Sequence, residues 1–436
     1  MKTEEQIYER ALKVLPGGIS RNIVFRKPHP YYVAEAHGAY VTDIYGVKRA
    51  DFANNIASLI HGHSHPKIVE AVIEQLQSGT AFSVGTEAEV MHAELLCNRI
   101  PSFDKIRFMN SGTEAVMSMI KAARAYTGKA KIAKAEGGYH GSYDAAEVSV
   151  GSSPDNWGNI DSPNSVGYVK GTPQGVLDDV VIYPFNDTER TINILNKHKG
   201  EIACVIIDPV PHRIGMIQAS QEFVEALYKW TRENNALLCF DEVICFRVEY
   251  EGAQSYYKVK PDMTSMGKMI GGGFPVGAFA GRKDIMDILD PGGKDFRFSL
   301  SGTFSANPMS MVAGRSAMEM FDREAVNKLN KTTEQAKKQV LEAGKVAGIP
   351  LSITGTGSLF KVHFRENPPL NYRDSYEDVN LKNIMNEFLN KMYDEGIIMV
   401  NSCSCFLSTV TTQTEIDLLS EAMLNSFKHI KPLLKV

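Results

Sequence analysis

Apolar and polar positions along the middle of the chain predict strands that alternate with helices. Leu237–Phe240 is a short apolar run of the kind found in strands that are buried on both faces. Ile202–Ile207 is a second strand candidate, and Gln221–Asn235 between them has apolar residues at helical spacing. Residues 202–240 are therefore predicted to form one βαβ unit with a right-handed crossover. This alternation is typical of the α/β class.

The two ends of the chain are patterned differently from the middle. Residues 4–14 predict a short helix, and residues 31–52 hold apolar stretches separated by turns, which indicates a small antiparallel meander. Toward the other end, long helical patterns are separated by the strand candidates Ser358–Phe364 and Ile397–Val400. We therefore expect a second, smaller domain built from both ends of the chain.

These changes of pattern divide the chain into three parts. Residues 1–60 are predicted to be an N-terminal segment that belongs to the small domain, residues 61–310 a large domain, and residues 311–436 a C-terminal small domain. The last helix is predicted to begin near Thr414, where a Thr-x-x-Asp capping pattern occurs.

Pro66 is predicted to be the first residue of a helix and not part of a metal site. Three histidines precede it, but metal-ligating histidines on a helix usually recur four residues apart. Proline is common at the first helical position. The apolar face of this helix consists of Ile68, Val69, Val72, Ile73 and Leu76. No metal ligand set is expected here.

Composition narrows the class of protein. The chain has 436 residues, of which 43% are hydrophobic and 22% charged, as in an ordinary globular protein with a large core. A formal net charge of −4 gives no general attraction to nucleic acid or to an acidic membrane. No apolar run approaches the roughly 20 residues of a membrane helix, and the charged N-terminus has no secretory h-region. The six cysteines follow no metal-binding spacing, and we expect a cytoplasmic protein.

Two charged residues, Asp241 and Lys268, stand out in the central stretch. Asp241 follows the apolar run Leu237–Phe240, and the carboxyl ends of buried strands are where open α/β sheets bind ligands. Lys268 lies between Gly267 and a glycine-rich run, flanked by methionines. Such a setting should lower the pKa of its amine, as a Schiff-base nucleophile requires. The alternatives are a helix-capping aspartate and a solvated lysine.

The strand candidate Lys105–Met109 leads into a helix through Asn110-Ser111-Gly112-Thr113-Glu114. The free backbone N–H groups and the hydroxyl at such a helix start suit a phosphate, although an ordinary N-cap has the same pattern. The glycine patterns of P-loop and dinucleotide-binding proteins are absent from the sequence.

A third candidate contact with a ligand is the aromatic pair Tyr139 and His140. They lie on a glycine-rich turn after the strand candidate Ile132–Ala135, where an aromatic ring can cover a flat ligand. A core tyrosine and a hydrogen-bonded histidine are the alternative. Beyond this turn, Gly151–Gly175 is rich in Gly, Ser, Pro and Asn and has no periodicity. A loop of this length is usually functional, and we predict a mobile gate over the site.

Taken together, these stretches resemble the class III aminotransferases. The resemblance is closest to the glutamate-1-semialdehyde aminomutases and their β-amino-acid aminotransferase relatives. It extends from Pro16 to Asp417 and is most specific over residues 110–115, 240–247, 261–281 and 301–308. It implies a pyridoxal-phosphate (PLP) enzyme of fold type I, with a large domain around a mostly parallel seven-stranded sheet and a smaller α+β domain.

The resemblance also implies roles for individual residues. Lys268 would form the Schiff base with PLP and move the substrate Cα proton, and Asp241 would bind the pyridine nitrogen. The other residues implied at the cofactor are Ser111, Gly112 and Thr113 at its phosphate, Tyr139, His140 and Val243 at its ring, and Thr303 from a neighbouring subunit. A residue shared in this way implies a homodimer.

The substrate side departs from the aminomutase pattern. The aminomutases have PGG-V-N-S-P-V-R, and Val24 stands here where the last Arg would be. The Pro16–Arg21 segment resembles instead the β-amino-acid aminotransferases, in which an Arg at the position of Arg21 binds carboxylate; Arg26 is the alternative. The Glu of the aminomutase E-A-G-F segment is missing from Ser402–Phe406.

These departures favour one activity over another. An aminotransferase is expected, with an amino acid as donor, a β-amino acid among the candidates, a carbonyl acceptor and a ping-pong cycle. An aminomutase is the alternative. A non-catalytic binding protein would be expected to have lost Lys268 or Asp241, and both are present.

Overall fold

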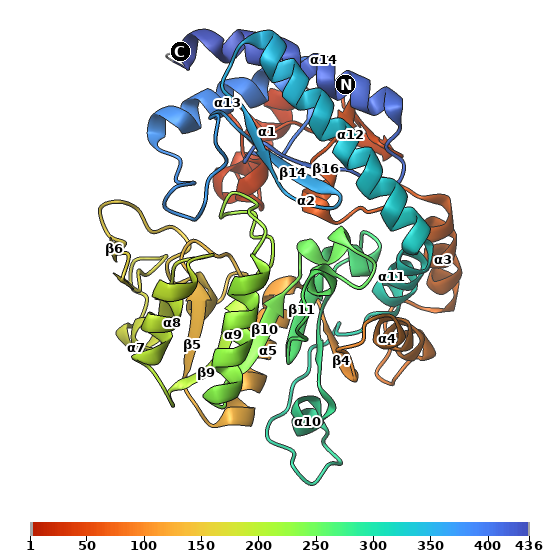
Figure 1. Ribbon diagram of the computed structural model, residues 1–436. Coiled ribbons are helices and arrows are strands. Elements are labelled where there is room, and N and C mark those ends of the chain that lie inside the picture. The colour runs from red at the N-terminus through yellow and green to blue at the C-terminus, as the bar shows by residue number, and fades with distance from the viewer. Residues whose placement is uncertain (1–2, 435–436) are drawn as a thin grey trace.

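The structure is a computed structural model that describes residues 3–434, and this part of the chain contains a large mixed sheet and three smaller ones (Figure 1). The large sheet has seven strands in the order β4-β12-β11-β10-β9-β5-β8. Strands β8, β5, β9, β10 and β11 pair in parallel, and β12 pairs antiparallel with both β11 and β4. The strands are β4 (Lys105–Met109), β5 (Lys131–Ala135), β8 (Val180–Tyr183), β9 (Ile202–Ile207), β10 (Leu237–Asp241), β11 (Met263–Gly267) and β12 (Gly277–Gly281).

Helices cover both faces of this sheet, as parallel strands require. Along β9, Cys204 and Ile206 pack in one core cluster with residues of α5, whereas Val205 and Ile207 pack with residues of α9. The amphipathic helix α9 buries Phe223 and other large side chains, each contributing about 1.5–3 kcal/mol. The helices of the large domain are α5 (Gly112–Thr127), α6 (Asp144–Glu147), α7 (Gln174–Asp178), α8 (Thr188–Asn196), α9 (Gln221–Glu233) and α10 (Lys283–Met286).

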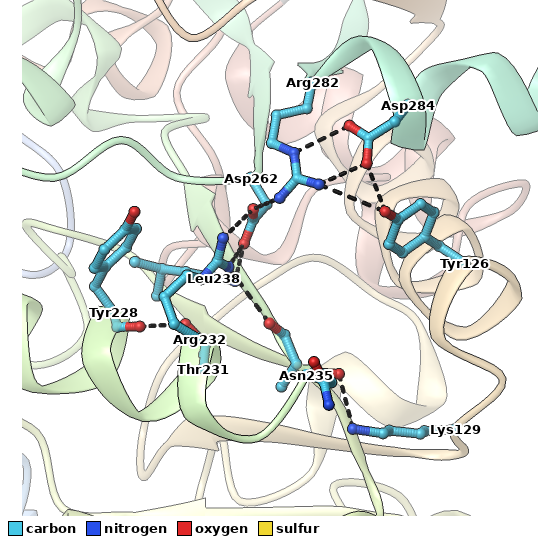
Figure 2. Close-up of polar contacts among 11 residues, drawn as sticks. Tyr126, Lys129, Tyr228, Thr231, Arg232, Asn235, Leu238, Asp262, Arg282 and Asp284 are labelled. Carbon is cyan, nitrogen blue, oxygen red and sulfur yellow. Dashed lines mark hydrogen bonds and ion pairs between the residues drawn. The ribbon is translucent and has the colours of Figure 1, made fainter.

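The buried carboxylate of Asp262 joins β10, β11 and β12 where β11 begins. It accepts from the backbone N–H of Leu238 at 2.7 Å and from Arg282 Nη1 at 2.6 Å, and it pairs with Arg232 on α9 (Figure 2). Arg282 also reaches Asp284 on α10. This network holds the three strands in register at the end of the sheet opposite to Asp241. The carboxylate of Asp262 is only 1% exposed, and its charged and N–H neighbours supply the hydrogen bonds that a buried polar group requires.

Both ends of the chain form the second body, in the upper part of Figure 1. The strand β15 near the C-terminus pairs with β3 near the N-terminus, in a four-stranded sheet of order β1-β2-β3-β15. The elements are α1 (Glu4–Leu12), β1 (Val33–His37), β2 (Tyr40–Asp43), β3 (Lys48–Asp51), α12 (Arg323–Ala347), β13 (Ser352–Thr354), β14 (Leu359–His363), α13 (Val379–Asp394), β15 (Ile397–Ile398), β16 (Ser404–Phe406) and α14 (Gln413–Ile430). The predicted meander is therefore present; the division near residues 60 and 310 remains our proposal.

The remaining helices and strands connect or flank these bodies. They are α2 (Asn54–Ala57), α3 (Pro66–Ser78), α4 (Glu87–Arg99), the hairpin β6 (Gly158–Asn159) and β7 (Ser162–Pro163), and α11 (Pro308–Met320). Pro66 begins α3 as predicted, but the predicted apolar face is only partly covered. Ile68 is buried, whereas Val69, Ile73 and Leu76 are 41%, 50% and 55% exposed. Along residues 3–434, no helix combines the length and the apolar character that crossing a membrane takes.

Candidate active site

The candidate site lies at the carboxyl ends of β9, β10 and β11. Asp241 is the last residue of β10 and is 4% exposed. Asp208 follows β9 directly, and Ser265 of β11 stands opposite Asp241 in the strand register. Since parallel neighbours end at the same edge of a sheet, residues that are far apart in the sequence meet here.

Three donors hold the carboxylate of Asp241. His140 Nδ1 lies 2.7 Å from Oδ2, and the backbone N–H of Val243 and the hydroxyl of Ser265 each donate to Oδ1 at 3.1 Å. An ionised carboxylate offers about four lone-pair positions. One position on this buried carboxylate is therefore left for a further donor, such as a protonated ring nitrogen.

His140 supports Asp241 as a neutral ring. Burial lowers the pKa of His140, although the charge of Asp241 acts in the opposite direction. A carboxylate only accepts, so Nδ1 carries the proton and Nε2 the lone pair. Nε2 is buried and has no hydrogen-bond partner among the residues that the structure describes. The site thus contains a buried polar atom that is still without a partner.

Lys268 enters the site on a strained backbone. Its φ is +52°, in the left-handed region that is unusual for a non-glycine residue, and such strain costs about 1–3 kcal/mol and is most often found at functional sites. Burial lowers the pKa of its amine, and Arg21 lowers it further, while Asp241 and Asp208 act against them. A larger fraction of this amine is therefore neutral, and able to act as a nucleophile, than for a solvated lysine.

The start of α5 packs against the residues that follow β10. Ser111 is its N-cap and accepts from the N–H of Glu114. A methyl group on Gly112 would lie 2.7 Å from Val243 Cγ1, so only glycine allows this close approach of α5 to the residue after β10. Thr113 Oγ1 accepts from the N–H of Ser142 in the turn that carries His140. The predicted phosphate-binding residues and Val243 are therefore neighbours.

The remaining predicted residues lie at the edge of this cluster. Tyr139 is partly exposed and packs edge-on against His212, with 6.1 Å between ring centroids. Arg21 Nη1 donates to Asn55 Oδ1 at 2.8 Å, and its charge acts on Lys268. Thr303 is exposed in the turn before α11. The alternative carboxylate ligand, Arg26, lines a different cavity.

Asp208 and His212 were not predicted from the sequence. Burial, and then the charge of Asp241, raise the pKa of Asp208 to about 8. Burial, with Lys268 and Arg213 as the next causes, lowers the pKa of His212 to about 3. The sequence did contain a signal for Asp208, because this residue follows the strand candidate Ile202–Ile207 just as Asp241 follows the next strand candidate. That the two strands are direct neighbours depends on the order of strands in the sheet.

The predicted gate segment, Gly151–Gly175, has structure of its own. It contains the hairpin β6–β7, and Arg373 donates to the carbonyls of Trp157 and Gly158 while pairing with Glu136 at 2.8 Å. The mobility of the segment remains a prediction.

No group of three or more metal-ligating side chains occurs in the part of the chain that the structure describes. Two of the three histidines before Pro66 have other partners. His61 contacts Thr409 Oγ1 and the carbonyl of Ala317, each at 2.8 Å, and His63 pairs with Asp51.

The residues present fit PLP. Asp241 has a lone-pair position for the proton on the ring nitrogen, and Lys268 is an amine with a lowered pKa for the aldehyde. The free N–H groups at the start of α5 and the positive end of its helix dipole suit an anion such as a phosphate. The site therefore offers an acceptor for a cationic ring nitrogen, an amine for a carbonyl group and N–H donors for a phosphate.

Comparison with known proteins places the chain among related enzymes. The family model described as Aminotransferase class-III matches residues 24–430. The glutamate-1-semialdehyde 2,1-aminomutase of Methanothermobacter thermautotrophicus is 35% identical over 97% of this chain and 98% of that protein.

Two solved structures are also similar. The omega-transaminase from Sphaerobacter thermophilus is 43% identical, with a TM-score of 0.96, over 99% of this chain and 98% of its own. The beta-phenylalanine aminotransferase from Variovorax paradoxus is 30% identical, with a TM-score of 0.85, over 97% and 93%.

Proposed function

The chain belongs to the class-III aminotransferase family, and from this premise we propose that it moves an amino group from an amino acid to a keto acid. Pyridoxal phosphate is the cofactor. The observation that carries the proposal is the buried Asp241–His140 pair together with Lys268, a partly buried lysine on a strained backbone whose amine is influenced by the charge of Asp241. The two halves of the reaction would follow one another in a ping-pong cycle.

PLP, when bound, supplies an aldehyde that takes up the amino group and a ring that accepts the electron pair of the substrate Cα–H bond. Lys268 would attach the cofactor and then move the proton from the substrate Cα to C4′ of the cofactor, for which a neutral amine is required. Asp241 would hold the proton on the ring nitrogen, and Val243 would pack on the ring. Gly112 and Thr113 would bind the phosphate.

Arg21 is the residue that we propose for the substrate carboxylate. Its guanidinium is held by Asn55 and is close enough to Lys268 to influence the pKa of that amine. The β-amino-acid preference rests on the Pro16–Arg21 segment and on the similarity to the beta-phenylalanine aminotransferase. A β-amino acid as donor is therefore the first substrate to test.

The alternative is a glutamate-1-semialdehyde 2,1-aminomutase, which the name of the similar Methanothermobacter protein favours. Against it stand Val24 in the position of the aminomutase Arg and the absence of a Glu from Ser402–Phe406. An aminomutase would isomerise glutamate 1-semialdehyde without any acceptor, whereas an aminotransferase would stop after one turnover per site until a keto acid is added.

Two measurements test the proposal. Borohydride reduction of the PLP enzyme followed by peptide mass mapping should place the pyridoxyl group on Lys268, and its presence on another lysine would contradict the mechanism. Sustained turnover of a β-amino acid only with a keto acid present would support the aminotransferase. Acceptor-independent turnover of glutamate 1-semialdehyde would establish the aminomutase instead.

The Arg21→Ala variant tests the carboxylate site. A charge-assisted hydrogen bond contributes about 1.5–3 kcal/mol, so KM for a β-amino acid should rise roughly tenfold to a hundredfold. KM for an uncharged amine should hardly change. Arg10→Ala, which replaces an exposed arginine on α1, is the matched control. Equal effects of Arg21→Ala on both substrates would show that Arg21 has only a structural role.

A homodimer with shared sites is part of the proposal. Thr303 lies in an exposed turn, as a residue that reaches a partner's cofactor should. The exposed apolar residues of α3 give a surface that a second copy could cover.

A further inference from the structure

A cavity of about 190 Å³ lies under the N-terminal segment, apart from the Lys268 cluster. Its lining comes from residues 23–33, from the segments 41–43 and 49–56, and from residues 393–401. Asp241, His140 and Lys268 do not line it. An apolar cavity of roughly 150 Å³ is known to bind benzene. This cavity therefore has room for one aromatic ring with a small substituent.

A column of alternating aromatic and cationic side chains forms one wall of the cavity. The rings of Tyr31 and Tyr393 are stacked, with 3.4 Å between centroids and 4° between planes. Arg26 lies over Tyr31 at 5.7 Å and Arg49 over Tyr393 at 3.8 Å. Asp43 pairs with Arg49 at 2.7 Å. The column thus contains two guanidinium groups and a single carboxylate.

Arg26 is the cation without a counterion. Its guanidinium lines the cavity and has no ion pair or hydrogen bond among the residues 3–434. Burial lowers its pKa, although the nearby Tyr31 raises it. Arg26 is half-buried, and a partly desolvated charge without a counterion has a cost that an anion in the cavity would reduce.

Tyr32 adds a second donor to the same cavity. Its hydroxyl is buried and finds no hydrogen-bond partner within the described part of the chain. Burial raises the pKa of this phenol, so it keeps its proton. Buried hydroxyl groups usually have a partner. The guanidinium of Arg26 and the phenol of Tyr32 can both donate, and most of the remaining lining side chains are apolar.

We propose that this cavity binds a small carboxylate with a flat apolar body, held by Arg26 and the hydroxyl of Tyr32. A single unpaired guanidinium matches a single negative charge, and its planar fork matches the two oxygens of a carboxylate. The apolar lining, which includes Val41, Val400 and Met399, would receive the body of the ligand. A dianion would bring a second charge without a partner into this lining.

The cavity is linked to the substrate side of the enzyme through one short segment. Ala53 and Ile56 line the cavity, and Asn55 between them holds Arg21. The two anion sites are nevertheless built from different arginines. Substitutions of Arg21 and Arg26 can therefore separate them.

The test is a calorimetric titration of the PLP-loaded enzyme with benzoate, and with benzamide as the neutral probe of equal shape. Benzoate should bind, and benzamide at least about tenfold more weakly, because the charge-assisted hydrogen bond is absent. Arg26→Gln should weaken the binding of benzoate about tenfold, and Tyr32→Phe about two- to tenfold. Lys27→Gln, which removes an exposed charge next in sequence, is the matched control and should leave binding unchanged.

Benzoate could also enter the substrate site, and Arg21→Ala separates the two sites. Benzoate binding that Arg21→Ala retains and Arg26→Gln loses supports the cavity. Binding that only Arg21→Ala loses, equal affinity for benzamide, or an unchanged affinity in Arg26→Gln would overturn the proposal.

Two further outcomes have a defined meaning. If Arg26→Gln does not fold, Tyr32→Phe decides, because it removes only a hydroxyl that has no partner; unchanged benzoate affinity in that variant overturns the proposal. If Arg26→Gln converts an otherwise dimeric enzyme into monomers, Arg26 meets a group of a second copy. The proposal would then also be wrong.

Discussion

At the residue scale, the two carboxylates that end β9 and β10 have different partners. Asp241 accepts from three donors, whereas Asp208 accepts from the N–H of Val210 at 2.9 Å and faces the charge of Asp241. Two buried carboxylates this close do not ionise together easily. We infer that Asp208 keeps its proton near neutral pH, so that it would add no second negative charge beside the proposed position of the ring nitrogen.

Replacing Asp241 by Asn should remove most of the activity and leave the fold intact. The amide has no charge to hold a proton on the ring nitrogen, and an electrostatic contribution of this kind accounts for roughly a hundredfold or more in rate. Turnover, circular dichroism and the melting temperature should be measured together. Ser265→Ala, which removes one hydrogen bond to the same carboxylate, is the control and should have a much smaller effect. Near wild-type turnover of the Asn variant would contradict the role of Asp241.

The raised pKa of Asp208 predicts how stability depends on pH. The pKa rises from the ordinary 3.8 to about 8 in the folded protein. The folded state then binds more protons than the unfolded state between these values, so this residue's contribution to stability falls as pH rises through 8. The side chain of Asn does not titrate, so Asp208→Asn should lose less stability than wild type when the pH is raised from about 5 to about 8, within this window. Denaturant unfolding at the two pH values measures this, and parallel losses in both proteins would refute it.

At the scale of elements, patterns that depend on neighbours in sequence were predictable. The strands β9 and β10 lie within one residue of their predicted ends, since an apolar run between polar turns is a local signal. The two-residue strands β6 and β7 inside 151–175 have no such signal. The proximity of Asp208 to Asp241, and the exposure of the apolar face of α3, depend on how distant elements are arranged. No periodicity in the sequence contains that information.

The start of α14 shows the limit of a local pattern. The sequence predicted capping at Thr414 with Asp417, but the structure begins α14 at Gln413. Thr412 is the N-cap and forms a capping box with Glu415, whose carboxylate also accepts from Tyr40 at 2.6 Å. Both patterns have suitable spacing, and the distant tyrosine contributes to the one that is used.

A pair of variants distinguishes the two caps. Thr412→Ala should lower the free energy of unfolding by about 1 kcal/mol, because the N-terminal N–H groups of α14 lose an acceptor. Thr414 lies two residues further on, and Thr414→Ala should change the free energy of unfolding by no more than about 0.5 kcal/mol, as substitutions at exposed sites usually do. Denaturant titration of both variants provides the measurement. A larger loss at Thr414 would show that the cap predicted from the sequence is the one that matters.

At the scale of the whole molecule, the exposed apolar residues and Thr303 lie on one surface. Val69, Ile73 and Leu76 of α3 are exposed, and Asn307 Nδ2 donates to the carbonyl of Thr80 just beyond the end of α3 at 2.9 Å. This bond holds the turn that contains Thr303 next to the apolar residues. A second copy that covered α3 would therefore also meet Thr303, which connects the dimer to the proposed phosphate site.

Ile73→Glu should convert the proposed dimer into monomers, because it places a charge in the apolar contact. Sedimentation should show the smaller species, and the affinity for PLP should fall since Thr303 no longer reaches a partner. Val346→Glu, on the exposed side of α12, makes the same chemical change elsewhere and should leave the dimer intact. A fully active dimer of Ile73→Glu would show that α3 is not the interface.

Mixing two inactive subunits tests whether the sites are shared. Lys268→Ala lacks the amine in each of its own sites, and we expect Thr303→Ala to weaken each partner's phosphate site. In a mixed dimer, one site would carry both changes and the other neither, so activity should return when the two variants are unfolded together and refolded. If each site were contained in one chain, every site in the mixture would carry one change. Activity would then stay at the sum of the separate variants, and the shared-site proposal would be wrong.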